Sequence, residues 1–176
     1  KSYGEMTFRR ALENSNNLIT LKIGLDLGIN KVSKFFKEIN LYENDVQEDL
    51  YSSLLGAIEN NLMNITKSYS VFVNGGYQVE PNIIKKVVSD KGDLVFNQDY
   101  FSCNYCDFKI TDRSYRKPRV KSKQDNIISP QTSYQILSIL KGAIERGTGK
   151  PLNSIQYPIA GKTGTTNDSK DLWFFG

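Results

Sequence analysis

The spacing of apolar residues changes along this chain, and the change limits the folds open to it. From residue 16 to residue 39 apolar residues recur at helical spacing, with Gly28 closing one expected helix and Asn30 expected to cap the next. A short helix capped by Thr7 is expected over residues 6–12, and another helix over residues 65–72. The N-terminal part of the chain is therefore predicted to be helical.

Strand patterns appear later in the sequence. Residues 83–89 and 94–96 predict a hairpin, and residues 97–126 lack any period, which indicates an exposed loop or insertion. Ser129 and Pro130 then begin a predicted amphipathic helix that ends at Gly147. Its apolar face is expected to hold Tyr134, Leu137, Leu140 and Ile144. Two more strands are predicted at residues 157–165 and 172–175.

The composition excludes several kinds of active site. The 176 residues are 39% hydrophobic, which suits one globular unit, and they contain no histidine. Ser-His-Asp and Cys-His sites and the commonest zinc sites need an imidazole, so a serine enzyme built from this sequence needs lysine as its base. Because the sequence has no apolar run of membrane-spanning length, any anchor or signal is expected to lie outside it.

The cysteines form one pair, Cys103-Asn104-Tyr105-Cys106. A single Cys-x-x-Cys supplies half of a zinc site, and the other half is not evident in the sequence. A tight disulfide or a pair of free thiols in an exported protein, a metal half-site, and no special role all remain open.

The most informative motif is the run from Gly161 to Thr166, Gly-Lys-Thr-Gly-Thr-Thr. It places an ammonium, hydroxyls and a residue without a side chain on one strand, against which an extended peptide ending in a carboxylate could lie. Side chains alternate along a strand, so Lys162 and Thr163 are expected to point to opposite faces unless the strand twists. The ordinary alternative is an edge strand with small polar residues.

A second motif, Ser15-Asn16-Asn17, lies between two predicted helices. A hydroxyl and an amide two residues apart can relay a proton and orient a lysine. Ser15 could instead simply cap the following helix, because serine and asparagine are both preferred caps.

Both motifs belong to the signature set of penicillin-binding proteins, which consists of Ser-x-x-Lys, Ser-x-Asn and Lys-Thr-Gly. Four stretches of this chain resemble that family: residues 3–17, 69–81, 128–149 and 160–176. The residues from Thr165 to Trp173 are most similar to the bifunctional class A branch, whose members add a membrane helix and a glycosyltransferase domain. The resemblance therefore implies a D,D-transpeptidase of peptidoglycan synthesis.

The resemblance implies a catalytic role for three residues. In this family a serine attacks the D-Ala-D-Ala carbonyl of a stem peptide and leaves an acyl-enzyme, which an amine on a neighbouring stem converts into a cross-link. Ser15 is expected to relay a proton, Asn17 to hold the lysine of Ser-x-x-Lys and the substrate amide, and Lys162 to supply positive charge.

It also implies a substrate-binding strand and the absence of any metal or organic cofactor. Thr163 and Thr165 are expected to bind the terminal carboxylate of the stem peptide or of a β-lactam, with Gly164 and Thr166 beside them. The N–H of Thr165 is expected to form half of the oxyanion hole. These ligands are the expected partners.

The sequence departs from the family at the nucleophile, because no Ser-x-x-Lys precedes Ser15 among residues 1–176. Two later matches, at residues 114–117 and 138–141, are interpreted as accidental. The first runs into Pro118, and the second lies on the polar side of the helix predicted after Ser129. The fragment alone is therefore expected to be inactive.

The implied fold is α+β, an antiparallel sheet with flanking helices and an all-helical subdomain. Residues 1–176 are expected to hold an incomplete transpeptidase domain, comprising most of the helical part and two central strands, with the insertion at residues 97–126. The nucleophile region, glycosyltransferase domain and membrane anchor are expected outside it. The parent protein is expected on the periplasmic or extracytoplasmic face of the inner membrane.

Within the family, D,D-carboxypeptidase activity or β-lactamase-like hydrolysis also remains open, and two functions of other classes are alternatives to transpeptidation. A gene remnant or a module that binds stem peptides or β-lactams without turnover would need no nucleophile. A nucleic-acid site would use the basic residues Arg113, Arg116, Lys117, Arg119, Lys121 and Lys123. Such a charge run is usually a solvated face, and the stacking aromatics of a binding platform do not accompany it, so no nucleic acid is expected.

Overall fold

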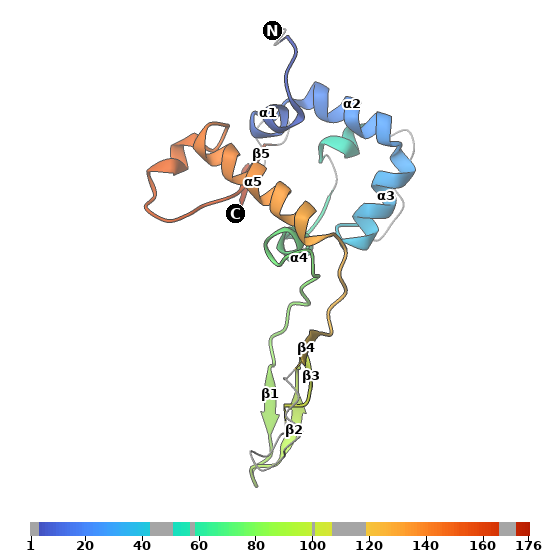
Figure 1. Cartoon of the computed structure of the whole chain (residues 1–176), viewed down its shortest axis with the longest axis vertical. Helices are drawn as coiled ribbons and strands as arrows, with labels where there is room; N and C mark the ends of the chain where they lie inside the picture. Colours follow the sequence, from blue (N-terminus) through green and yellow to red (C-terminus); the bar gives the residue numbers. More distant parts are fainter. Residues whose placement is uncertain (1–3, 43–50, 57–58, 100, 107–118, 166–171) are drawn as a thin grey trace.

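The computed structural model describes residues 4–42, 51–56, 59–99, 101–106, 119–165 and 172–176. It shows a body of helices with one strand pair, from which two further hairpins extend (Figure 1). The body contains both candidate motifs.

The N-terminal helices follow the predicted boundaries closely. They are α1 (Phe8–Glu13), α2 (Asn17–Leu27) and α3 (Ile29–Glu38), and Thr7 caps α1 by accepting the N–H of Arg10 at 3.3 Å. The prediction that Asn30 caps the third helix is wrong. Gly28 has a φ of 88°, which lets the chain turn without a spacer, so α3 begins at the next residue and Asn30 lies inside it.

Two longer helices complete the body. Helix α4 spans Leu62–Val73 and α5 spans Pro130–Glu145, and the short 3-10 helices Tyr51–Leu55 and Lys150–Ser154 lie against α2 and α5. Ser129 caps α5 by accepting the N–H of Thr132 at 3.1 Å, as predicted. Helix α5 contacts both α1 and α4, and the buried apolar residues include Ala11, Ile39, Val71, Ile139, Ala143 and Ile144.

The prediction that Tyr134 lies on the buried apolar face of α5 is wrong. Tyr134 is 72% exposed, whereas the adjacent Ser133 is buried and donates its hydroxyl to the main-chain oxygen of Phe72 at 2.6 Å. This bond joins α5 to α4. A polar residue takes the buried position because its hydroxyl has a backbone partner there.

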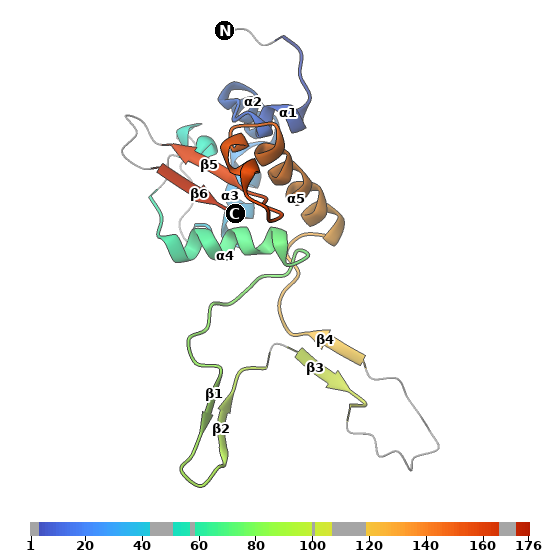
Figure 2. The same cartoon turned by 90° about the vertical axis from the view of Figure 1, so that its left-hand side faces the viewer.

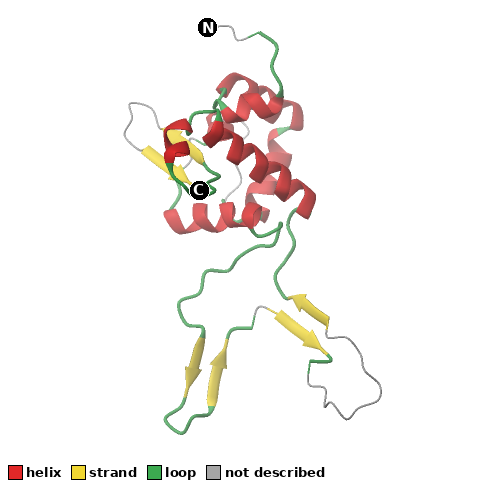
Figure 3. Cartoon of the chain, turned by 60° about the vertical axis from the view of Figure 1, so that its left-hand side comes forward, coloured by secondary structure: helices red, strands yellow, loops and turns green. Residues whose placement is uncertain are grey.

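The two projecting hairpins stand apart from the helical body in two views (Figures 2 and 3). Strands β1 (Lys86–Val88) and β2 (Leu94–Asn97) pair antiparallel, as predicted. Strands β3 (Phe101–Asn104) and β4 (Arg119–Ser122) form a second antiparallel pair within residues 97–126, where the sequence predicted a loop. Residues 97–126 showed no regular period, so neither strand was predicted.

The last strand pair lies on the body beside α4 and α5 (Figure 2). Strands β5 (Lys162–Thr165) and β6 (Leu172–Phe175) are antiparallel, and the ring of Phe175 stacks on Tyr69 of α4 at 5.3 Å. Strand β5 is shorter than predicted, because Pro158 lacks a ladder donor and the chain bends before Gly161.

The described part of the chain is therefore α+β, with antiparallel strands against a helical body. Across the described ranges, the helices are too short or too polar to cross a membrane.

Candidate functional site

Ser15 occupies the junction between α1 and α2 with its hydroxyl free of any capping role. Asn16 caps α2 instead, accepting the N–H of Ile19 at 3.1 Å. Ser15 has a φ of 52°, in the left-handed region that residues other than glycine seldom adopt. The sequence left open whether Ser15 was only a cap, and the structure answers that it is not.

Lys162 reaches this hydroxyl from the first position of β5. Its Nζ donates to the Oγ of Ser15, which lies 147 positions away in the sequence, and to the main-chain oxygen of Thr163 at 2.9 Å. Strand β5 is tied to α5 by a bond from the Gly161 N–H to the Leu140 carbonyl at 3.2 Å. The two predicted motifs therefore meet through their polar side chains.

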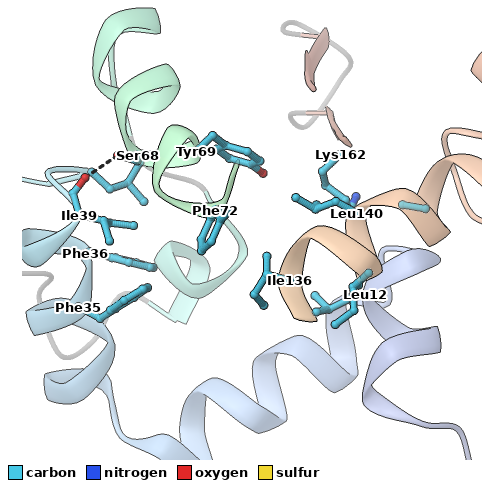
Figure 4. A pocket seen from close by; sticks show the side chains of 13 residues that line it. Leu12, Phe35, Phe36, Ile39, Ser68, Tyr69, Phe72, Ile136, Leu140 and Lys162 are labelled. Atoms are coloured by element: carbon cyan, nitrogen blue, oxygen red, sulfur yellow. Dashed lines mark hydrogen bonds between the residues drawn. The ribbon is translucent and has the colours of Figure 1, made fainter. Parts of the chain in front are cut away.

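An apolar cavity of about 260 Å³ lies next to Lys162 (Figure 4). Helices α1, α3, α4 and α5 supply its walls, which include Leu12, Phe36, Tyr69, Phe72, Ile136 and Leu140. Burial in this surface lowers the pKa of the Lys162 ammonium from its ordinary value and raises the pKa of the Tyr69 hydroxyl. The Lys162 ammonium therefore donates a hydrogen bond to a hydroxyl and is partly shielded from water.

The other residues of the Lys-Thr-Gly motif follow along β5. The hydroxyl of Thr163 lies 2.9 Å from the hydroxyl of Thr148. Gly164 and Thr165 are exposed, and a Cβ added at Gly164 would meet nothing nearer than the Cβ of Trp173 at 3.8 Å. This leaves open space over the strand.

Two predicted site residues remain to be placed. Asn17 is exposed at the first position of α2, two residues after Ser15. Thr166 lies outside the described residues. The structure therefore joins Ser15 to Lys162 directly, while Thr163 is turned toward a residue that the sequence analysis did not select.

An ion pair between the buried Glu13 and the exposed Arg146 also lies beside this site and was not predicted. Glu13 is 2% exposed, and the Nε and Nη2 of Arg146 donate to its two carboxylate oxygens at 2.9 Å and 2.5 Å. These hydrogen bonds raise the pKa of Arg146. The partners are 133 positions apart in sequence, and no local pattern connects residues at that separation.

The chance Ser-x-x-Lys match on α5 has partners of its own. Ser138 accepts a bond from Arg9 at 3.2 Å, and Lys141 pairs with Glu145 at 3.5 Å along the helix surface. This fits its interpretation as accidental. The match at residues 114–117 lies outside the described residues.

The cysteine pair is resolved as a disulfide between Cys103, which lies in β3, and Cys106, which follows that strand. Of the alternatives that the sequence left open, this selects the tight disulfide. In the described ranges, His, Cys, Asp and Glu side chains do not group in threes as metal ligands.

Comparison with known proteins agrees with these motifs. The family model described as "Penicillin binding protein transpeptidase domain" matches residues 1–176. Penicillin-binding protein 1A of Rickettsia typhi is 38% identical over 98% of this chain, which spans 22% of that relative's length.

Solved structures agree on the fold. Penicillin-binding protein 1A from Haemophilus influenzae superposes with a TM-score of 0.75 at 28% identity, over 96% of this chain and 28% of that one. Penicillin-binding protein A from M. tuberculosis, as an imipenem acyl-enzyme complex, gives a TM-score of 0.67 at 14% identity over 99% of this chain and 40% of that one, which supports the fold alone.

The predicted family and the predicted α+β fold are both confirmed by these matches. This chain belongs to the penicillin-binding protein transpeptidase family, and it is similar to the class A members named penicillin-binding protein 1A.

Proposed function

We propose that this chain forms one wall of the acyl-transfer site of a peptidoglycan D,D-transpeptidase, which acts on stem peptides ending in D-Ala-D-Ala and is acylated by β-lactams. The observation that carries the proposal is the hydrogen bond from Lys162 Nζ to Ser15 Oγ, because it joins the Ser-x-Asn and Lys-Thr-Gly motifs into one site. The match of residues 1–176 to the family model of the penicillin-binding protein transpeptidase domain supports the same chemistry.

The proposed reaction has two acyl transfers. The serine of Ser-x-x-Lys gives its hydroxyl proton to the lysine of that motif and forms a bond to the carbonyl carbon, the bond to the leaving D-Ala nitrogen breaks, and that amine takes a proton through Ser15. In the second transfer an amine of another stem attacks the ester, loses its proton by the same path and frees the serine. Lys162 keeps the Ser15 hydroxyl aligned for both proton transfers, and Asn17 holds the lysine of Ser-x-x-Lys and the substrate amide.

The nucleophile itself is proposed to come from another part of the full-length protein. Residues 1–14 contain no Ser-x-x-Lys, and the two later matches are the ones interpreted above as accidental. Residues 1–176 alone are accordingly proposed to be inactive. The glycosyltransferase domain and the N-terminal membrane helix of the class A branch are proposed for the same protein, which places this domain on the extracytoplasmic side.

Strand β5 is proposed to bind the substrate along its exposed edge. The Lys162 ammonium attracts the terminal carboxylate, the hydroxyls of Thr163 and Thr165 donate to it, and Thr166 follows them. Gly164 leaves room for the peptide backbone, since no atom outside its neighbours approaches its Cβ position closer than 3.8 Å. The Thr165 N–H is proposed as half of the oxyanion hole.

The test is to give the purified full-length protein a donor stem peptide and an amine acceptor. Transpeptidation predicts a cross-linked product and released D-Ala. Release of D-Ala without a cross-linked product would make the protein a D,D-carboxypeptidase. Binding of a β-lactam without a covalent adduct would favour the binding module that lacks turnover.

A further inference from the structure

A ring of contacts connects Ser15 to Lys162 through residues outside both motifs. Next to Lys162, the hydroxyl of Thr163 lies 2.9 Å from the hydroxyl of Thr148. The main-chain N–H of Thr148 donates to the carbonyl oxygen of Glu13 at 3.1 Å, two residues before Ser15. The hydrogen bond from Lys162 to Ser15 closes the ring.

The Glu13 side of this ring is held firmly. Its carboxylate is buried and takes two hydrogen bonds from Arg146, with Arg9 a further 3.7 Å contact. Glycines allow this approach, because a Cβ at Gly142 would lie 2.1 Å from the Glu13 carboxylate and a Cβ at Gly147 would lie 2.1 Å from the Glu13 carbonyl oxygen. The segment that carries Thr148 is therefore fixed against the end of α1.

The β5 side of the ring is held by contacts with α5 and β6. The Gly161 N–H donates to the Leu140 carbonyl at 3.2 Å, and β5 pairs with β6. The bond between the hydroxyls of Thr148 and Thr163 adds a contact between β5 and the fixed segment. Thr148 is thus placed to control where β5 lies relative to Ser15.

We propose that Thr148 is a positioning residue for acyl transfer, which keeps Lys162 within hydrogen-bond reach of Ser15 by holding Thr163. The inference rests on the function proposed above. Proton relay needs heavy atoms about 2.6–3.2 Å apart, and a displacement of about 1 Å can lower a rate by about a hundredfold. The role belongs to the Thr148 hydroxyl, since its N–H bond to Glu13 survives a change of side chain.

Two substitutions separate this role from folding. Thr148→Val keeps the shape and the N–H but loses the hydroxyl, and Thr148→Ser restores the hydroxyl. Thr148 is exposed, so the loss should leave the melting temperature near that of wild type. Thr66→Val is the matched control, because the Thr66 hydroxyl donates to the Leu62 carbonyl at 2.8 Å within its own helix, α4.

The experiment measures binding and acylation separately in the full-length protein, using a fluorescent penicillin and rapid mixing. Thr148→Val is expected to lower the acylation rate constant about tenfold, with a smaller change in the dissociation constant of the initial complex, because Thr163 also belongs to the proposed carboxylate site. Thr148→Ser should recover most of the rate, and Thr66→Val should match wild type.

Three results would overturn the inference. An unchanged acylation rate in Thr148→Val would remove any role for the hydroxyl. A loss confined to the dissociation constant would make Thr148 a ligand-contacting residue instead. Failure of Thr148→Ser to recover the rate would also contradict it. If wild type itself forms no adduct, the proposed function fails with it, so the two failures are distinguishable.

Discussion

Gly147 packs directly against the main-chain carbonyl of Glu13, with no room for a side chain. A Cβ at Gly147 would lie 2.1 Å from the Glu13 oxygen and 2.9 Å from the Cα of Ala143. The end of α1, where Ser15 follows, therefore meets the end of α5 as backbone against backbone. This contact gives the Ser15 junction a fixed support.

Replacing Gly147 with alanine should destabilise the domain. The added methyl must push α1 and α5 apart, and overpacking of this kind costs about 1–3 kcal/mol. The measurement is the thermal unfolding of the full-length protein. Gly164→Ala is the control, since the nearest atom to its Cβ is 3.8 Å away and its melting temperature should stay near wild type. Equal melting temperatures for Gly147→Ala and wild type would disprove the close packing.

Replacing Lys162 with methionine should greatly slow acylation by penicillin while the domain stays folded. The side chain keeps its apolar part against Tyr69 and Leu140 in the cavity wall, but the bond to Ser15 is lost. Acylation by penicillin should fall by about 10²–10³, as for loss of one preorganised donor. The melting temperature should be unchanged or higher, because burial disfavours the charged form of Lys162. A variant that unfolds at the working temperature would contradict this prediction.

Lys162 should also change how the free energy of unfolding depends on pH. Burial lowers the folded-state pKa of Lys162 below 10.5, so the unfolded chain binds this proton more tightly. Below the folded-state pKa, Lys162 is charged in both states, and burying this charge lowers the free energy of unfolding by its full amount. As the pH rises from the folded-state pKa toward 10.5, the buried lysine loses its proton and the free energy of unfolding increases. The free energy of unfolding of wild type minus that of Lys162→Met should therefore increase over this alkaline window. A difference that stays flat or falls would show that the folded-state pKa is not lowered.

The pair formed by Glu13 and Arg146 should respond to substitution as a unit. Arg146→Met leaves the buried Glu13 carboxylate without its two main donors and should lower the melting temperature. Adding Glu13→Gln removes the charge and should recover part of that loss, which a double-mutant cycle measures. Additive effects of the two changes would mean that the pair does not couple.

The disulfide should be dispensable for acyl transfer. Cys103 lies in β3 and Cys106 follows it, on a hairpin that projects from the body holding Ser15 and Lys162 (Figure 3). The double substitution Cys103→Ser and Cys106→Ser should therefore leave the rate of penicillin acylation at the wild-type value. A thiol assay on the denatured wild-type protein, with and without reductant, verifies the bond. A slower acylation in the variant would connect this hairpin to the site.

Local sequence patterns predicted the features that depend on neighbouring residues. Thr7 and Ser129 cap their helices as expected, because a cap needs only a hydroxyl and an N–H about one turn later. Gly28 ends α2 for an equally local reason. The motif residues Ser15 and Lys162 were found through family resemblance, and the structure supplied their contact.

Contacts between distant parts of the chain were beyond prediction from one sequence. The bonds from Arg146 to Glu13 and from Thr148 to Thr163 depend on how α1, α5 and β5 pack, and periodicity carries no information about such pairs. The exposure of Tyr134 has a similar cause, since the neighbouring Ser133 found a backbone partner on α4. The disulfide was one of several open alternatives until the fold placed the two cysteines.

The central claim is that Ser15 and Lys162 together support acyl transfer in this protein. The most direct measurement is the rate of covalent penicillin binding to the full-length protein, followed by intact mass spectrometry, for wild type, Ser15→Ala and Lys162→Ala. Wild type should form a single adduct, and acylation should be slowed by about a hundredfold or more in both variants. Acylation of the folded variants at the wild-type rate would contradict it.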